Sequence, residues 1–471
     1  MKNDHINNFR TKDHKLVGSF SFSTPSLMIN DLDVAKQMFI KDFDHFVDRR
    51  SVTFGHEYLD NMLFFMAGEP WKEMRSIISP MFTSGKLKNM YKLFNKIGSD
   101  FSEHVDELAR SNEEINARDL SSKYTLQVIA STGFGIDIAA YRDDAESEKF
   151  RKMTAKLTGK DAGALGILKI LLSFLLPSLF KALKLETFDR ESINYFADII
   201  KQAINSRKGN QQKRNDMVDL LLDALHSKDV EDEEVKKQIQ EELEVAKPMK
   251  VSSIPKDKVE VMLISNLIML FFAGMDTSSA LLAVLMYCLA KNPEVQEKLF
   301  DEINDALASS DDGVLDYNTV QTLPYMDMVT NEALRFFPIG DHERKCVKDY
   351  NIPGTTFTIP EGMMVSLPAT GIMSDEKYFP NPEQFNPENF SRENKDKRNP
   401  YAFMPFGIGP RNCIGNRLAQ LNLKSGLVHL VSGYKVMTCN KTPEKLIVDP
   451  TSGNTDVKGG IWVKFEKRTN V

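Results

Sequence analysis

The segment FMPFGIGPRNCIGNRLAQL places a cysteine, an arginine and glycines at fixed offsets, F-x-x-G-x-R-x-C-x-G from Phe406 to Gly415. The glycines permit close backbone approaches that a side chain would block. Residues 416–431 have a helical pattern, so Cys413 is predicted to lie just before a helix N-terminus. The helix dipole and the nearby Arg411 favour a thiolate there, and a thiolate can bind a metal ion. The motif alone leaves open a buried structural cysteine beside a turn.

The other three cysteines, Cys288, Cys346 and Cys439, lie far from one another in the sequence, and none belongs to a C-x-x-C pair. This spacing predicts neither a zinc site nor a disulfide framework. Free thiols in a chain of this size indicate a reducing compartment.

Two further groups of residues could do chemistry. The apolar stretch 261–290 contains AGMDTSS, in which Gly274 is predicted to let a buried helix open locally, and Asp276 and Thr277 can hydrogen-bond and relay protons. The alternative is a satisfied Ser/Thr-rich turn of a core helix. In NEALRFFP, Glu332 and Arg335 are three residues apart, share a helix face and can form an ion pair.

These motifs, in this order, resemble those of the cytochrome P-450 superfamily, in particular the animal branch that metabolises drugs, steroids and xenobiotics. KDFDHFVDRR and WKEMRSIISPMFTSGKLKNM carry the resemblance to that branch. The likeness extends from about Lys41 to the C-terminal GGIWVKFEK. It implies the cytochrome P-450 fold, a triangular and mainly helical domain around haem b.

The resemblance also implies roles for individual residues. Cys413 would be the axial ligand of the haem iron, whose thiolate favours O–O cleavage. Asp276 and Thr277 would serve oxygen activation. The remaining haem contacts would come from Phe406, Arg411, Trp71, Arg75 and, with a weaker motif match, Arg344.

The same resemblance predicts a structural clamp near the haem. Glu332 and Arg335 match the E-x-x-R helix of the family, and their third partner lies in PENF, where Asn389 replaces the usual arginine. An amide can still hydrogen-bond, so we expect a weaker clamp rather than a lost one.

The implied function is a monooxygenase that inserts one atom of O₂ into apolar molecules such as xenobiotics, steroids or lipids, with electrons from NADPH through a flavoprotein reductase. Three alternatives stay open: a haem-thiolate isomerase or dehydratase acting on peroxides, a non-catalytic haem-binding protein, and an unstable haem-free chain. The Asp276–Thr277 pair argues against the first, which needs no proton relay. The predicted substrate walls are residues 61–65, Phe272, Ala273, Asp276 and Ile339; Asp341 or His342 could add a contact, with a surface loop as the alternative.

Composition bounds the fold. The chain has 471 residues, is 42% hydrophobic and 27% charged, and carries a net charge of −6, which excludes the basic surface typical of nucleic-acid binding. No Gly/Ser or Pro-rich linker divides it, so we predict one mainly α domain with a small β part (α+β) over residues 1–471. Within it, residues 207–258 read as a charged surface connection and 376–411 as structured coil before the cysteine loop.

Membrane and partner contacts are further expectations. The polar start MKNDHINNFR predicts neither a signal peptide nor the anchor helix usual in the branch. The stretch 261–290 is read as a buried helix ending at Asn292-Pro293, and Gly163–Leu185 as a flap that lies in a bilayer surface, or a core helix pair. By resemblance the chain would act at the cytosolic face of the endoplasmic reticulum, and Lys86, Lys88 and Lys424 would dock the acidic reductase.

Overall fold

A computed structural model describes residues 14–21, 24–138, 140–141, 145–157, 163–207, 214, 216–226, 258–449 and 455–469. The polar start of the chain and most of the charged connection at 207–258 therefore lie outside the described residues. The described chain divides into two compact units. The first comprises Met1–His45, Tyr91–Val128 and Met275–Val471, and the second comprises Phe46–Met90 and Ile129–Gly274.

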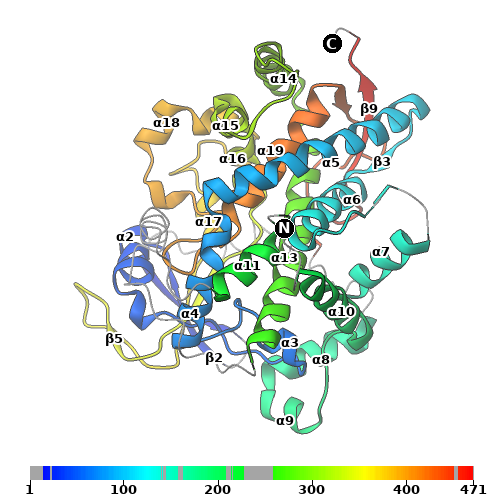
Figure 1. Ribbon diagram of the computed structural model, residues 1–471. Helices are drawn as coiled ribbons and strands as arrows, with labels where there is room; N and C mark the ends of the chain where they lie inside the picture. The colour runs from blue at the N-terminus through cyan, green and yellow to red at the C-terminus, as the bar shows by residue number, and fades with distance from the viewer. Residues whose placement is uncertain are drawn as a thin grey trace. The chain divides into compact units, whose positions relative to one another are not determined.

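The first unit is mainly helical (Figure 1). Two of its helices begin at residues that are typical of helix starts. Pro293 stands in the first turn of α14, where its missing N–H is tolerated, and Asp316 caps α15 through the Thr319 N–H. Helix α19 packs against α14, α15 and α16. The helices are α2 (Leu32–Lys36), α5 (Ser84–Ser111), α6 (Ala117–Ile129), α13 (Val259–Lys291), α14 (Pro293–Ala308), α15 (Tyr317–Thr322), α16 (Pro324–Phe336), α17 (Ala369–Met373), α18 (Arg392–Lys397) and α19 (Asn416–Val431).

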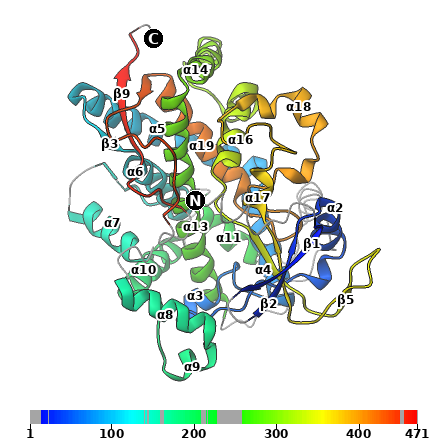
Figure 2. The same cartoon turned by 180° about the vertical axis from the view of Figure 1, so that it is seen from behind.

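Small sheets complete the first unit, so the predicted mainly α fold with a minor β part is confirmed. The largest has the order β1-β2-β7-β4, in which β2 pairs parallel with β7. Strands β1 and β2 pair antiparallel and lie side by side in Figure 2. A second sheet has the order β3-β9-β8, and β5 pairs with β6. The strands are β1 (Leu16–Ser21), β2 (Thr24–Ile29), β3 (Ile115–Asn116), β4 (His342–Lys345), β5 (Tyr350–Asn351), β6 (Thr358–Ile359), β7 (Met364–Leu367), β8 (Tyr434–Met437) and β9 (Trp462–Lys467).

The second unit is held together by an aromatic core. Phe134, Phe150, Phe196 and Phe271 are buried, and their ring centroids lie 4.8–5.7 Å apart in tilted and edge-to-face pairs. The helices, besides the part of α13 up to Gly274 and the part of α5 up to Met90, are α3 (Glu57–Asp60), α4 (Gly68–Ile78), α7 (Ala145–Leu157), α8 (Gly163–Leu175), α9 (Pro177–Ala182), α10 (Arg190–Arg207) and α11 (Met217–His226).

Among the described residues, helix α13 is the one that is both long and strongly apolar. By length and composition it could cross a membrane, but 67% of its most apolar window is buried inside the protein. It ends at Lys291, directly before Asn292-Pro293. The prediction of a buried core helix with this end is therefore confirmed.

Candidate active site

The loop before α19 is folded back on itself. The Cys413 N–H donates to the carbonyl of Phe406 over 2.7 Å, and Gly407 and Gly409 have φ values of +83° and +72°. A Cβ on Gly409 would lie 2.0 Å from the Phe39 carbonyl oxygen, so only glycine fits there. The loop delivers Cys413 three residues before the first residue of α19, Asn416.

Cys413 differs from the other cysteines in its exposure. All four lie in described parts of the chain, and Cys413 alone is exposed, whereas Cys288 and Cys346 are buried. Burial raises the pKa of the Cys288 thiol well above its ordinary value and also raises the pKa of Cys346. A raised pKa disfavours the thiolate of those two cysteines, and Cys439 is half-buried outside the glycine loop, so Cys413 is the cysteine best placed to act as a thiolate ligand.

Two buried cations lie beside the cysteine loop. Arg411 and Arg344 are 3% and 1% exposed, and Arg344 Nη2 donates to the main-chain oxygen of Arg411 over 3.5 Å. Strand β4 sets the position of Arg344, which pairs with Val365 of β7. Adjacent buried guanidinium groups suit an anion with planar carboxylates.

This donor set fits a haem. Within the described ranges, no cluster of three or more His, Cys, Asp or Glu side chains could hold a metal ion by itself. A haem supplies four nitrogen ligands and two propionates, and Arg344 and Arg411 are suited to the propionates.

A buried ion pair fastens α16 to the coil that follows α17. Arg335 Nε and Nη2 donate to the two carboxylate oxygens of Glu332 over 2.8 and 2.7 Å. Arg335 also donates to the carbonyls of Pro382 and Gln384. Asn389 Nδ2 reaches both Glu332 oxygens at 3.2 and 3.3 Å, so the amide at the usual arginine position does contact the carboxylate.

Arg398 is a neighbour of this pair that no sequence motif indicated. Its Nη1 donates to the carbonyl of Asn389 over 2.7 Å, and its guanidinium lies over the rings of Phe379 and Phe390 at 4.4 and 4.8 Å. Burial lowers the pKa of Arg398, an effect that the charge of Glu332 opposes and that of Arg335 reinforces. A guanidinium therefore lies near Glu332 although position 389 carries an amide.

The turn of α13 around Asp276 differs from the prediction in one respect. The helix is continuous through Gly274, so the expected local opening is not seen. Gly274 instead allows close packing, because a Cβ there would lie 3.0 Å from Ile129 Cδ1. In this turn Ala273 is exposed, and Asp276 and Thr277 are half-buried.

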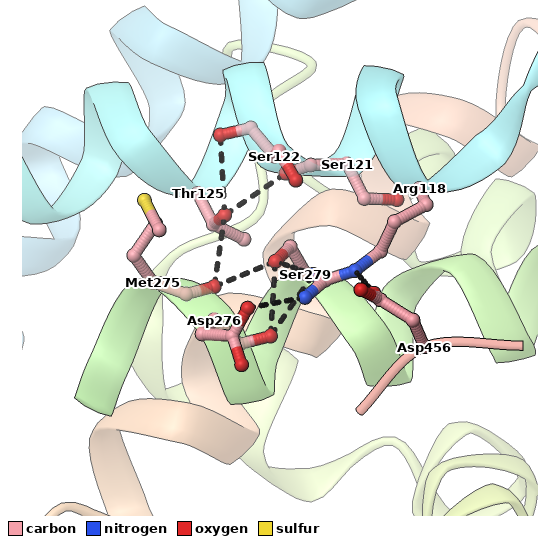
Figure 3. A network of polar contacts seen from close by, with 8 residues as sticks. All are labelled: Arg118, Ser121, Ser122, Thr125, Met275, Asp276, Ser279 and Asp456. Carbon is pink, nitrogen blue, oxygen red and sulfur yellow. Dashed lines mark hydrogen bonds and ion pairs between the residues drawn. The ribbon is translucent and has the colours of Figure 1, made fainter. Parts of the chain in front are cut away.

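The Asp276 carboxylate is held by Arg118, at the start of α6 (Figure 3). Arg118 also donates through Nε to Asp456, 2.8 Å away, in the loop before β9. Sequence reasoning missed this network, since one arginine in a charged helix carries no motif and its partners lie 158 and 338 residues away.

The remaining predicted site residues on α4 and before it belong to the second unit. Trp71 and Arg75 lie one turn apart on α4 and are 4% and 6% exposed. In the 61–65 segment, the Leu63 N–H donates to Asn266 Oδ1 over 2.8 Å, which ties the segment to the first half of α13.

Two expectations about polar residues need correction. Lys424 is 2% exposed and its Nζ is paired with Asp327 at 2.5 Å, so it presents no charge to a partner. His342 lies in β4 rather than in a surface loop, and its Nε2 contacts the Met404 carbonyl at 3.0 Å. Asp341 accepts the Thr370 N–H over 2.9 Å. Asp341 itself is exposed in the coil before β4, as the surface-loop alternative predicts for it.

The mainly helical fold, and the glycine loop that presents an exposed cysteine just before a helix, agree with the haem-thiolate class that the sequence motifs resemble. A family model described as Cytochrome P450 matches residues 1–244 and 260–460. The chain is 35% identical to cytochrome P450 9e2 of Blattella germanica, over 98% of this chain and 87% of the relative. It is 32% identical to cytochrome P450 9b2 of Drosophila melanogaster (98% and 87%) and to cytochrome P450 6B6 of Helicoverpa armigera (97% and 86%).

The chain therefore belongs to the cytochrome P450 family and is an oxidoreductase of the monooxygenase type. Membership implies a haem cofactor, a redox partner and a substrate.

Proposed function

We propose that this chain binds haem b through Cys413 and inserts one oxygen atom of O₂ into apolar organic molecules. The second oxygen atom leaves as water, and NADPH supplies both electrons through a flavoprotein reductase. The observation that carries the proposal is the exposed Cys413 thiol, set in a glycine loop beside the buried guanidinium groups of Arg344 and Arg411.

Each predicted residue has a task in this proposal. A thiolate-bound haem supplies the oxygen-activating chemistry. Cys413 holds the iron, with Phe406 closing its loop, and Arg344 and Arg411 bind propionates. Trp71 and Arg75 on α4 are proposed for the same purpose.

On α13, Thr277 and Asp276 are proposed to deliver protons to the reacting oxygen. The buried Glu332–Arg335 pair, with Asn389, holds the coil that leads to the cysteine loop. Neither task requires these residues to bind substrate.

Substrate preference is proposed to follow from apolar side chains. Residues 61–65, Phe272, Ala273 and Ile339 offer aliphatic and aromatic surface, which selects for size and low polarity rather than for one compound. Asp276 pairs with Arg118, so its charged side chain does not contribute to the apolar surface that would contact a substrate.

Two surfaces are proposed as contacts, one with the membrane and one with the reductase. Helices α8 and α9 expose leucines such as Leu165 (66%) and Leu168 (60%), which suits a peripheral contact with the endoplasmic reticulum membrane. At the start of α5, Lys86 and Lys88 are exposed and can attract an acidic reductase.

Reversing the charges of Lys86 and Lys88 tests the reductase surface. Turnover with the reductase should fall, and turnover with peroxide should stay unchanged. An equal loss in both assays would contradict this docking surface.

The decisive test is the difference spectrum of the reduced, carbon monoxide-bound protein. We expect a Soret band strongly red-shifted from that of histidine-ligated haem, and its loss in Cys413→Ser. Cys439→Ser is the matched control, because Cys439 is half-buried and lies outside the glycine loop. An unchanged spectrum in Cys413→Ser would refute the ligand, and product formed without NADPH under air would favour an isomerase or dehydratase.

A further inference from the structure

Arg118 is shared between two carboxylates of the first unit. Its guanidinium pairs with Asp276 of α13 through Nη2 and with Asp456 through Nε (Figure 3). The three side chains are 11%, 16% and 25% exposed. A partly buried guanidinium between two carboxylates can keep one of them when the other leaves.

The same arginine is fastened to the backbone of α13. Arg118 Nη1 donates to the main-chain oxygen of Asp276 over 2.9 Å and also contacts Ser279 Oγ. Ser279 Oγ and Thr125 Oγ1 both donate to the Met275 carbonyl, over 2.7 and 3.3 Å. Side chains of α6 therefore hold two consecutive carbonyls in the turn that carries Asp276.

We propose that Arg118 is a positioning residue for the proton-delivering Asp276, and that Asp456 is the counterion that retains Arg118 when Asp276 turns away. This inference rests on the proposed monooxygenase function. A proton from solvent water converts the Asp276 carboxylate to the neutral acid, which releases Arg118. The acid then gives its proton to the oxygen atom that leaves as water, and the carboxylate returns to Arg118. A second round of the same transfer supplies the other proton of that water, and NADPH supplies its two electrons.

The charges explain why the second carboxylate matters. A guanidinium deprived of its only carboxylate in a poorly solvated place is strongly unfavourable. With Asp456 in place, release of Asp276 leaves Arg118 paired. Without Asp456, Arg118 would hold Asp276 more firmly and slow its departure.

Substitutions at Asp456 and at Arg118 separate positioning from counterion exchange. Asp456→Asn should lower kcat by roughly tenfold, because proton transfer contributes about 100-fold or more to such reactions, and should leave KM nearly unchanged. Less product should form per NADPH oxidised. Amide hydrogen exchange over residues 275–280 of the haem-loaded protein should stay as slow as in the unaltered chain. Arg118→Gln should also lower kcat but should speed that exchange, and Arg118→Lys should recover part of the protection.

The second unit offers a matched control. Arg207 is likewise shared between two acidic side chains, Asp216 and Asp219, with exposures of 14%, 1% and 6%. Asp219→Asn should cost stability without changing the product formed per NADPH.

Two outcomes would overturn the inference. One is a loss of kcat in Asp456→Asn no greater than in Asp219→Asn. The other is faster exchange at 275–280 in Asp456→Asn, which would make its role merely structural. Failure of the proposed function is recognised separately: the unaltered chain would then form no NADPH-dependent product, while the exchange difference in Arg118→Gln would persist.

Discussion

At the scale of single residues, Glu332 shows how a buried charge is made tolerable. Its side chain has no exposed surface, and its oxygens accept from Arg335, from Asn389 and from the main-chain N–H of Asn386. Removing one partner from such a group costs more than the pair itself contributes, because the remaining charge stays buried.

Arg335→Ala should accordingly lower the free energy of unfolding by about 3–5 kcal/mol, since it leaves Glu332 without its cation. Asn389→Ala should cost about 1–3 kcal/mol, the usual penalty for a lost buried hydrogen bond. Urea unfolding of both variants measures the difference. Equal losses in the free energy of unfolding would contradict the view that Arg335 stabilises Glu332 more than Asn389 does.

The position of Arg398 leads to a second prediction at the scale of single residues. Restoring the family's usual arginine with Asn389→Arg places a new guanidinium beside Arg398 and Arg335, and like charges in a buried site repel. We expect Asn389→Arg to lower the free energy of unfolding. The same substitution should lower it less in a protein that already carries Arg398→Met. A double-mutant cycle on the free energy of unfolding measures this coupling, and additive effects would rule it out.

At the scale of elements, the glycine loop before α19 depends on backbone conformations that the sequence pattern indicates. Gly409→Ala combines an unfavourable positive φ with a clash against the Phe39 carbonyl. We expect a loss of more than about 1 kcal/mol and poor haem retention. Gly433→Ala is the matched control, because Gly433 lies outside the cysteine loop, is not among the glycines with a positive φ, and a Cβ there meets nothing within 4 Å. Thermal unfolding and the haem-to-protein absorbance ratio measure both, and equal behaviour would show that the loop tolerates a side chain.

Helix α19 also carries a group that links stability to pH. His429 Nε2 is buried without a hydrogen-bond partner among the described residues, and burial lowers the pKa of His429 from 6.5 to about 4. Between these values the unfolded chain binds a proton that the folded chain does not. Stability should therefore fall as pH drops from 6.5 towards 4, by at most about 3 kcal/mol. His429→Leu should flatten this dependence and the exposed His14→Gln should not, as urea unfolding at several pH values would reveal.

Local patterns predicted the elements better than their contacts. The end of α13 at Asn292-Pro293 and the span of α19 follow from proline, glycine and apolar periodicity, which act over a few residues. The burial of Lys424 and the pairing of Arg118 with Asp456 could not be predicted, because they depend on which distant segments meet. Gly274 falls between these cases. The sequence pattern indicates that glycine is needed there, but the structure shows that the need comes from close packing against Ile129 and not from a local opening of the helix.

At the scale of the whole molecule, two apolar helical segments are used differently. Most of the apolar window of α13 is buried, so that helix forms core. In α8 and α9 many apolar side chains are exposed, among them Leu175 of α8 (48%) and Leu179 of α9 (45%), although Phe180 of α9 is buried. A cluster of exposed leucines beside lysines is unfavourable in water and typical of a surface that meets lipid.

Binding to lipid vesicles tests this surface. Leu165→Ser combined with Leu168→Ser should weaken partition of the haem-loaded protein into phosphatidylcholine–phosphatidylserine vesicles by about 100-fold or more, since each buried leucine contributes about 1.5–3 kcal/mol. Ile447→Ser, at a residue 48% exposed in the first unit, should leave partition unchanged. Sedimentation with the vesicles measures both. If the double variant bound as well as the Ile447→Ser protein, α8 would not be the membrane contact, and its exposed leucines would need another partner.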